Sequence, residues 1–163
     1  MMLKKNHTSK EKLRYSKITP YIYIGTNMLQ YSHFERLKKL GISVDVDLEG
    51  EHIEKIPMRG LDTFLWLPTK NGHAPTHDQM AAGVAFLDQM VSHKKKVYVH
   101  CKNGHGRAPT LVAAYLATKG MTPEKAIAFV KKRRPVVHLD KEQIASIKRF
   151  FNLYRTHFKV RSA

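Results

Sequence analysis

The chain has 163 residues, the length of one ordinary domain, and 42 % of them are hydrophobic, which is enough to bury a single core. Lysine and arginine number 29 against 13 aspartates and glutamates, so the formal net charge is +16, which favours acidic or phosphorylated partners. A single cysteine excludes an intrachain disulfide framework and zinc sites built on cysteine pairs, and it favours a reducing compartment.

The N-terminal segment, residues 1–16, is polar and basic, and we interpret it as a mobile arm that precedes one domain over residues 17–163. No apolar stretch typical of a secretory signal follows the charged residues, and no apolar run is long enough to cross a bilayer. We therefore expect a soluble intracellular protein, with the cytoplasm as the first choice of compartment and the nucleus as the alternative. The basic runs at 94–96, 131–134 and 148–149 are each typical of solvated faces or helix ends.

The first half of the domain alternates predicted strands and helices. Residues 18–24 (ITPYIYI) are rich in β-branched and aromatic residues and predict a strand. Residues 31–40 show apolar residues at helical spacing, with Ser32 as N-cap and Gly41 as the stop. Residues 42–48 (ISVDVDL) alternate apolar and polar residues, which predicts a half-buried strand.

A short strand, a long helix and another strand follow. Residues 61–67 form an apolar segment that ends at Pro68. Residues 76–93 are predicted to be helical because one face is apolar. That face carries Met80, Val84, Leu87 and Val91. Residues 96–100 (KVYVH) are β-branched and aromatic and predict a strand.

Three helices complete the chain. Residues 109–119 (PTLVAAYLATK) have a proline near the first turn and a glycine after the last. The residues Thr-Pro-Glu at 122–124 begin a second helix, which ends before Pro135. The last helix covers residues 140–158. Its apolar face consists of Ile144, Ile147, Phe150, Phe151 and Tyr154. This alternation predicts an α/β domain with a central, largely parallel sheet flanked by helices.

The segment between the strand at 96–100 and the helix at 109–119 has the features of an anion-binding loop. A helix N-terminus presents unpaired backbone N–H groups and a partial positive charge, and a preceding loop adds further amides. Gly104 and Gly106 allow a ligand to approach the backbone closely. Arg107 supplies a planar guanidinium that binds two oxygens of a phosphate.

Cys101 stands at the first turn of this loop. Amides that stabilise a phosphate dianion also stabilise a thiolate, which is the form that attacks phosphorus. We expect an in-line attack by Cys101, equatorial oxygens held by Arg107 and the loop amides, and hydrolysis of the cysteinyl-phosphate by water. The alternative is a buried small thiol. It is weakened because His100, Gly104 and Arg107 accompany the cysteine between a strand and a helix.

The segment HCKNGHGR at 100–107 fits the HCxxGxxR signature and resembles the cysteine-dependent protein tyrosine phosphatases. The downstream PTLVAAYLATKGMTPEKAIAFVKKRRP and the upstream ITPYIYIGTN and FERLKKLGISVDVDL look like the compact dual-specificity branch. The likeness covers nearly the whole chain after the arm. It implies a dual-specificity-phosphatase-like catalytic domain over 17–163, with a phosphatase P-loop between a strand and a helix, and with no metal and no organic cofactor.

The resemblance also implies roles for individual residues. Cys101 is the implied nucleophile and Arg107 the phosphate clamp, while His100 would position the loop and help to keep the thiolate. The implied phosphate-binding loop consists of Lys102, Asn103, Gly104, His105 and Gly106, together with Arg107. Lys102 and His105 make the rim basic, as in family members that act on multiply phosphorylated lipids or inositols; the alternative is that they only tune the local field.

Two positions depart from the family pattern. The family usually has serine or threonine directly after the arginine, where a hydroxyl supports the departing thiolate in the second step. Ala108 stands there, and Thr110 is the nearest hydroxyl in sequence, so we expect slower breakdown of the phospho-enzyme. The family also carries an aspartic acid some thirty residues before the cysteine, and alignment on LPT and APT places Asn71 at this position.

Asparagine cannot donate a proton as an acid, and general acid–base catalysis is typically worth about 10²–10⁴-fold in rate. His73, on the same loop, is a substitute because histidine exchanges protons near neutral pH, although a solvated loop histidine fits this position equally well. Asp62 belongs to the segment before the loop, and Asp78 to the first turn of the following helix.

The sequence therefore predicts a phosphatase that hydrolyses phosphomonoesters of tyrosine, extending to serine and threonine. Two enzymatic alternatives use the same loop. One is a phospholipid or phosphoinositide phosphatase on an anionic membrane. The other is an RNA 5′-triphosphatase, for which a basic surface and an absent acid are suitable. A low-activity phosphate-binding pseudophosphatase is a third alternative, which Asn71 and Ala108 favour and which an intact Cys101 and Arg107 disfavour.

Overall fold

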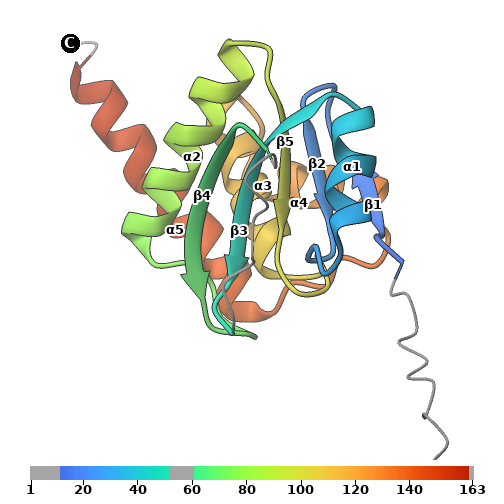
Figure 1. Cartoon of the computed structure of the whole chain (residues 1–163). Coiled ribbons are helices and arrows are strands. Elements are labelled where there is room, and N and C mark those ends of the chain that lie inside the picture. The colour runs from blue at the N-terminus through green and yellow to red at the C-terminus, as the bar shows by residue number, and fades with distance from the viewer. Residues whose placement is uncertain (1–11, 52–60, 162–163) are drawn as a thin grey trace, which may run out of the picture.

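The computed structural model describes residues 12–51 and 61–161, and of 158–161 the backbone alone. Five strands and five helices are present in this part of the chain (Figure 1). They are β1 (Tyr15–Lys17), β2 (Ile22–Gly25), α1 (Tyr31–Lys39), β3 (Ile42–Glu49), β4 (Thr63–Thr69), α2 (His77–Ser92), β5 (Lys96–His100), α3 (Arg107–Thr118), α4 (Pro123–Arg133) and α5 (Lys141–Arg161). None of the helices in the described ranges is both long and apolar enough to cross a membrane.

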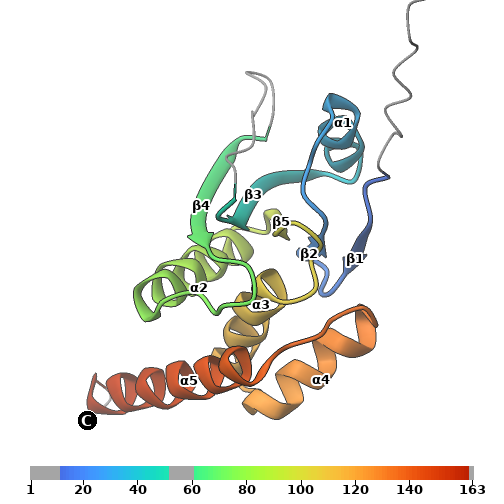
Figure 2. The ribbon, with the colours of Figure 1, turned by 90° about the horizontal axis from the view of Figure 1, so that it is seen from below.

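The strands form one sheet in the order β1-β2-β5-β3-β4. The pairs β2–β5, β5–β3 and β3–β4 are parallel, and β1 alone is antiparallel, at one edge. Figure 2 shows α1 on one side of the sheet and α2 to α5 on the other. This arrangement confirms the predicted α/β class, with a largely parallel sheet between helices. The carboxyl ends of β2, β3, β4 and β5 therefore meet at one edge of the sheet.

The boundary of the predicted arm needs correction. Leu13 is buried, and β1 pairs with β2 in the register Tyr15↔Gly25, so residues 12–16 belong to the folded domain. Residues 1–11 of the predicted arm lie outside the described residues. The sheet gains an edge strand here because the short antiparallel β1 supplies backbone partners for β2.

The strand predicted over 18–24 begins only at Ile22. Residues 18–21 form a turn instead, in which Ile18 N donates to Ile22 O at 2.8 Å. The Thr19 hydroxyl oxygen accepts bonds from the N–H groups of the two residues that follow Pro20. Side-chain hydrogen bonds of this kind offer the backbone an alternative to the strand ladder, which the β-branched composition did not reveal.

The capping residues that the sequence indicates are present at the N-termini of α2 and α4 but not at that of α1. Thr76 and Gln79 form a complete capping box at α2, and the Thr122 hydroxyl oxygen accepts a bond from Lys125 N at α4, as the sequence indicates. The prediction of Ser32 as N-cap of α1 is wrong. The N-cap is Gln30, which has an extended backbone and makes no side-chain cap bond. The helix begins two positions earlier than Ser32 as N-cap would require, so Ser32 lies within the first turn.

Strand β3 is buried on both faces rather than half-buried as its alternating sequence predicts. Val44, Val46 and Leu48 face the core beneath the larger helix layer, while Asp45, Asp47 and Glu49 are buried on the other face. His100 of β5 lies among these carboxylates: its Nε2 is 3.2 Å from Asp45 Oδ1, and its Nδ1 is 3.7 Å from Asp47 Oδ1. The strand is central in the sheet, and both of its faces are covered. The alternation of apolar and polar residues therefore distinguishes an apolar buried face from a polar buried face, not a buried face from an exposed one.

Burial raises the pKa of Asp47 to about 6, against the opposing attraction of His100. The folded chain therefore keeps a proton on Asp47 up to about pH 6, whereas the unfolded chain releases it near the ordinary pKa value of 3.8. A folded state that holds the extra proton loses stability as the pH rises through this window.

We expect the substitution Asp47→Asn to favour folding increasingly, relative to the parent chain, as the pH rises from about 4 to about 7, because an amide has no proton to lose. Urea unfolding of both chains at several pH values measures this trend. The matched control is Asp62→Asn, which makes the same chemical change at an exposed position, so the trend expected for Asp47→Asn should not appear in it. A constant or reversed trend for Asp47→Asn would contradict the assignment.

Candidate active site

The candidate site lies at the edge where the parallel strands end, at the lower side of Figure 1. Strand β5 ends at His100, Cys101 follows directly, and residues 101–106 connect to α3, which begins at Arg107. Figure 2 looks onto this edge, with α3 between the sheet and the outer helices α4 and α5. In open parallel sheets, ligands bind outside the carboxyl ends of the strands. The predicted order of strand, loop and helix is therefore present, with α3 starting two residues earlier than predicted.

The N-terminus of α3 carries no side-chain cap, unlike those of α2 and α4. Its N-cap is Gly106, whose side chain offers no acceptor, so the first amides of the helix are available to an anion at the loop. Cys101 is buried at the other end of the same loop. Loop and helix together place backbone dipoles and one thiol around the same space.

Gly104 has a φ of +65°, in the left-handed region, and its contacts exclude a side chain. A Cβ at this position would collide with the carbonyl oxygen of Gly25 in β2 and lie 2.9 Å from Arg134 Nη2. The backbone of the loop is also tied to the segment after β2, since Asn27 N donates to Lys102 O at 3.2 Å. The loop is thus packed backbone against backbone, which only glycine permits here.

Arg134, at the end of α4, holds the loop from outside. Its Nε donates to Gly104 O at 2.8 Å and its Nη2 to Asn103 O at 3.0 Å, while Nη1 reaches Ser16 Oγ at 3.3 Å. The side chain is buried, which corrects the prediction that the basic run 131–134 is a solvated face. Burial lowers the pKa of Arg134, yet it remains the cation that satisfies two carbonyl oxygens of the loop.

Arg107 is only 3 % exposed and reaches from α3 to the ends of β3 and β4. Its Nη1 donates to Glu51 Oε2 at 2.7 Å and to Thr69 O at 2.8 Å, and its Nη2 donates to Glu51 Oε1 at 3.1 Å. The pairing is bidentate, which fixes the plane of the guanidinium. The hydrogen bond from Arg107 lowers the pKa of Glu51, so the carboxylate is ionised under ordinary conditions.

A cavity of about 230 Å³ lies over the loop. It is lined by Asn71, Gly72, Cys101, Asn103, His105, Gly106, Arg107, His138, Asp140 and Gln143. The predicted nucleophile, clamp and most of the predicted loop therefore surround one space. Gly104 and Lys102 help to form the loop without lining this cavity, and His100 lies behind it among the acids of β3.

The residues considered as substitutes for the missing general acid lie at different distances from the cavity lining. Asn71 lines the cavity, at the place where the sequence pattern expects an aspartate. The His73 ring lies outside the lining and its Nδ1 is 3.3 Å from Glu142 Oε2 on α5. Asp62 is an exposed residue before β4, at the opposite end of the sheet, and Asp78 is in the first turn of α2.

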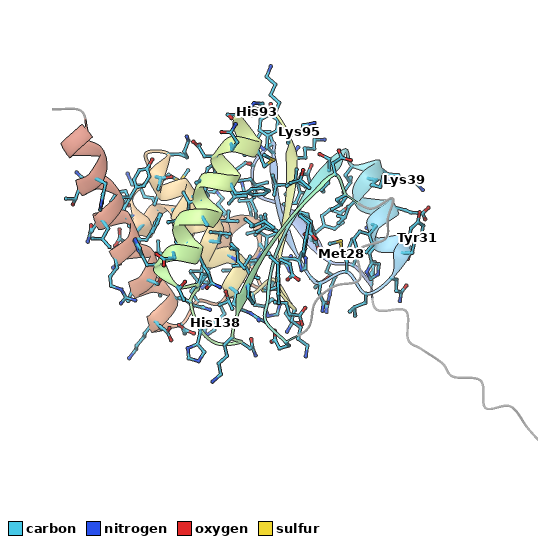
Figure 3. The ribbon with its side chains drawn as sticks, turned by 60° about the vertical axis from the view of Figure 1, so that its left-hand side comes forward. Met28, Tyr31, Lys39, His93, Lys95 and His138 are labelled. Carbon is cyan, nitrogen blue, oxygen red and sulfur yellow. The ribbon has the colours of Figure 1, made fainter. Side chains whose placement is uncertain are left out.

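Three lining residues come from the connection between α4 and α5 and from the first turn of α5, and they were not singled out in the sequence as site residues. They are His138, Asp140 and Gln143. Figure 3 shows His138 at the end of the molecule opposite His93 and Lys95, which precede β5. His138 N donates to His105 O at 2.9 Å, which joins this connection to the loop. The only sequence signal was the pattern Asp-x-x-Gln at 140–143, which indicates a helix start but not its neighbours.

The hydroxyl near Ala108 is already engaged. Thr110 Oγ1 donates to Gly106 O at 2.8 Å, within the first turn of α3, and Ala108 is fully buried. The Thr110 hydroxyl therefore donates its hydrogen bond to the backbone. At the rim, burial lowers the pKa of His105, and the charges of Arg134 and Arg14 lower it further, so this ring is neutral near pH 7.

Fold and site together define a class: an α/β domain with a cysteine and an arginine at the two ends of an amide-rich loop, as in the cysteine-dependent phosphatases. The family model for the dual specificity phosphatase catalytic domain matches residues 22–152, and the chain belongs to this family. This match confirms the resemblance seen in the sequence.

The chain is similar to a phosphatidylglycerophosphate phosphatase, PTPMT1, of Arabidopsis thaliana, with 28 % identity over 145 residues, 85 % of this chain and 43 % of that protein. It shares 39 % identity over 77 residues with the human phosphatidylglycerophosphatase and protein-tyrosine phosphatase 1, covering 47 % of this chain and 38 % of that protein. The chain thus spans less than half the length of these two relatives. The crystal structure of PTPMT1 superposes with a TM-score of 0.80 at 25 % identity, covering 90 % of this chain and 99 % of the other.

The packing of Gly104 generates a prediction about phosphate binding. We expect Gly104→Ala to weaken the binding of inorganic phosphate about tenfold or more, because the loop must shift and lose at least one charge-assisted amide bond. Titration calorimetry or phosphate-dependent thermal stabilisation measures the change. Gly120→Ala is the matched control: its φ is +106° and a Cβ there meets nothing within 4 Å. Both variants bear backbone strain of about 1 kcal/mol, but only the first should lose phosphate, and an equal loss in both would contradict this explanation.

Proposed function

We propose that this domain hydrolyses phosphomonoesters, with Cys101 as the nucleophile and a cysteinyl-phosphate as the intermediate. The observation that carries the proposal is the placement of Cys101 and Arg107 on one cavity, at the two ends of a loop that leads into the uncapped N-terminus of α3. Backbone amides and a planar guanidinium are the groups that bind the equatorial oxygens of a transferring phosphoryl group.

In the first step, the Cys101 thiolate attacks phosphorus and the ester oxygen leaves. Arg107 enters this step already oriented, because Glu51 and the Thr69 carbonyl oxygen fix its guanidinium. A group held in place before the substrate arrives costs no reorganisation during the reaction. In the second step, water attacks phosphorus and the P–S bond breaks. Ala108 offers no hydroxyl to the departing thiolate, and Thr110 is bonded elsewhere, so we propose that this step is the slower one.

Phosphotyrosine is the first candidate substrate, because a phenol leaves more readily than an alcohol. A phospholipid with a terminal phosphate is the second candidate. The names of the two relatives, phosphatidylglycerophosphate phosphatase in one case and phosphatidylglycerophosphatase with protein-tyrosine phosphatase in the other, support both classes. The net charge of +16 favours an anionic membrane surface or an acidic protein as the carrier of the phosphate.

We expect the purified chain to turn over an aryl phosphate and a phosphotyrosine peptide. The same assay measures its turnover of phosphatidylglycerophosphate in vesicles and of triphosphate-ended RNA. Cys101→Ser should abolish turnover of every substrate, since an alcohol is a far weaker nucleophile, while inorganic phosphate still binds.

The pattern of turnover separates the candidates. Faster turnover of the vesicle lipid than of the peptide favours the phospholipid, and the reverse favours the protein substrate. Hydrolysis of RNA alone, or phosphate binding without turnover of any of the four, would overturn the proposal in favour of a triphosphatase or a binding module.

A further inference from the structure

The cavity lacks a proton donor at the position where the family pattern places one, because Asn71 stands there. Among the described residues, one carboxylate lines the cavity and a second, Glu51, is bonded to the lining residue Arg107. Glu51 is bonded to both terminal nitrogens of Arg107 and serves to orient it. Asp140 is the remaining one, and it lines the same cavity as Cys101 and Arg107.

Asp140 is held in place by a reciprocal cap at the start of α5. Its Oδ1 accepts a bond from Gln143 N at 2.8 Å, and its own N–H donates to Gln143 Oε1 at 3.2 Å. Oδ1 is its only oxygen engaged as a side-chain acceptor by the described residues, so the cap leaves Oδ2 to carry a proton. A carboxyl fixed by its backbone and one oxygen has few orientations of its own.

Gln143 connects this cap to the other walls of the cavity. It is buried, its Nε2 donates to His73 O at 3.1 Å, and a Cβ added to Gly106 would lie 2.9 Å from that same nitrogen. One amide therefore contacts the 70–73 turn, the loop before α3 and the start of α5. Gln143 therefore positions Asp140 relative to the loop.

We propose that Asp140 is the proton-transfer residue of this phosphatase, in place of the carboxyl that is missing at position 71. The inference rests on the function proposed above. As Cys101 Sγ bonds to phosphorus, the P–O bond to the leaving group breaks and the leaving oxygen takes the proton of the Asp140 carboxyl. Water then attacks phosphorus and gives its proton to the Asp140 carboxylate. The P–S bond breaks with its electron pair returning to sulfur, and the enzyme is restored.

Histidines are the competing proton donors at this cavity. Burial, and then the charges of Arg134 and Arg14, lower the pKa of His105, which disfavours the protonated form of this ring. The His73 ring is engaged with Glu142 outside the lining. His138 is the serious competitor, because it lines the cavity and its side chain is exposed. The test must therefore distinguish Asp140 from His138.

The decisive variant is Asp140→Asn. Asparagine is as good an N-cap as aspartate, so the cap on Gln143 N and the stability of α5 should be kept while the proton is lost. Asp78→Asn is the matched control, since it removes a carboxylate from the first turn of α2 that does not line the cavity. His138→Gln tests the competitor. Each chain is assayed on p-nitrophenyl phosphate and on an alkyl phosphate, with phosphate affinity and thermal unfolding measured alongside.

We expect Asp140→Asn to lower kcat on the alkyl phosphate by about 10²–10⁴-fold, with phosphate affinity and melting temperature close to those of the parent chain. On p-nitrophenyl phosphate, whose leaving group needs no proton, the variant should still release a burst of about one nitrophenol per enzyme, as the parent chain should because its second step is the slower one, and then turn over more slowly than the parent. This pattern follows because only the hydrolysis step still requires the base.

Three results would overturn the proposal: an unchanged kcat on both esters, an equal loss on both with no burst, or the ester-dependent loss in His138→Gln instead. Each requires an active parent chain. A parent chain that turns over neither ester would instead overturn the proposed function, so the two failures are distinguishable.

Discussion

The 101–106 loop holds its shape because one guanidinium binds two of its carbonyl oxygens from behind. Arg134 donates to the carbonyls of Asn103 and Gly104, and it also contacts Ser16 at the edge strand. Each of these carbonyls would otherwise need water or another donor in a crowded position. A cation that binds carbonyl oxygens on the outer side of a loop also adds positive potential to the site that the loop encloses. The end of α4, far from the loop in sequence, thus contributes to the electrostatics of the cavity.

Buried carboxyl side chains in the sheet behind the loop are a second constraint on the position of the loop. Asp45, Asp47 and Glu49 follow one another on one face of β3, and His100, the residue before the cysteine, lies between the first two. Asn27 Nδ2 donates to Glu49 Oε2 at 2.9 Å, and the same residue bonds the loop at Lys102 through its backbone. Buried charges are retained only where partners compensate their desolvation. The position of the strand end that bears Cys101 therefore depends on polar contacts as well as on apolar packing.

The parts of this molecule that were predictable are those governed by local patterns. The strand at 96–100, the loop glycines and the helix after Arg107 follow from residues adjacent in sequence, and the family resemblance rests on the same stretch. The burial of Arg134 and the nearness of Asp140 to Cys101 were not predictable, because both depend on how α4 and α5 pack against the loop. The prediction from the local sequence was wrong for one residue. Arg134 ends a run of four basic residues, which is typical of a solvated face, yet its side chain is buried. Its tertiary partners, two backbone carbonyls, leave no mark in the sequence.

The charge of the cavity also differs from what the composition indicates. The chain as a whole has an excess of sixteen positive charges, but Arg107, which lines the cavity together with Cys101, has its charge offset by Glu51 through two hydrogen bonds. A phosphate dianion that enters the cavity therefore meets a guanidinium–carboxylate pair rather than an isolated cation. Its binding must depend strongly on the loop amides and on the uncapped end of α3. The surface charge acts at longer range, by raising the local concentration of anionic substrates, and this contribution is screened by salt. The surface charge thus attracts anionic substrates, whereas the loop and the end of α3 bind the phosphoryl group. Raised ionic strength should therefore weaken the long-range attraction much more than the binding of the phosphoryl group in the cavity.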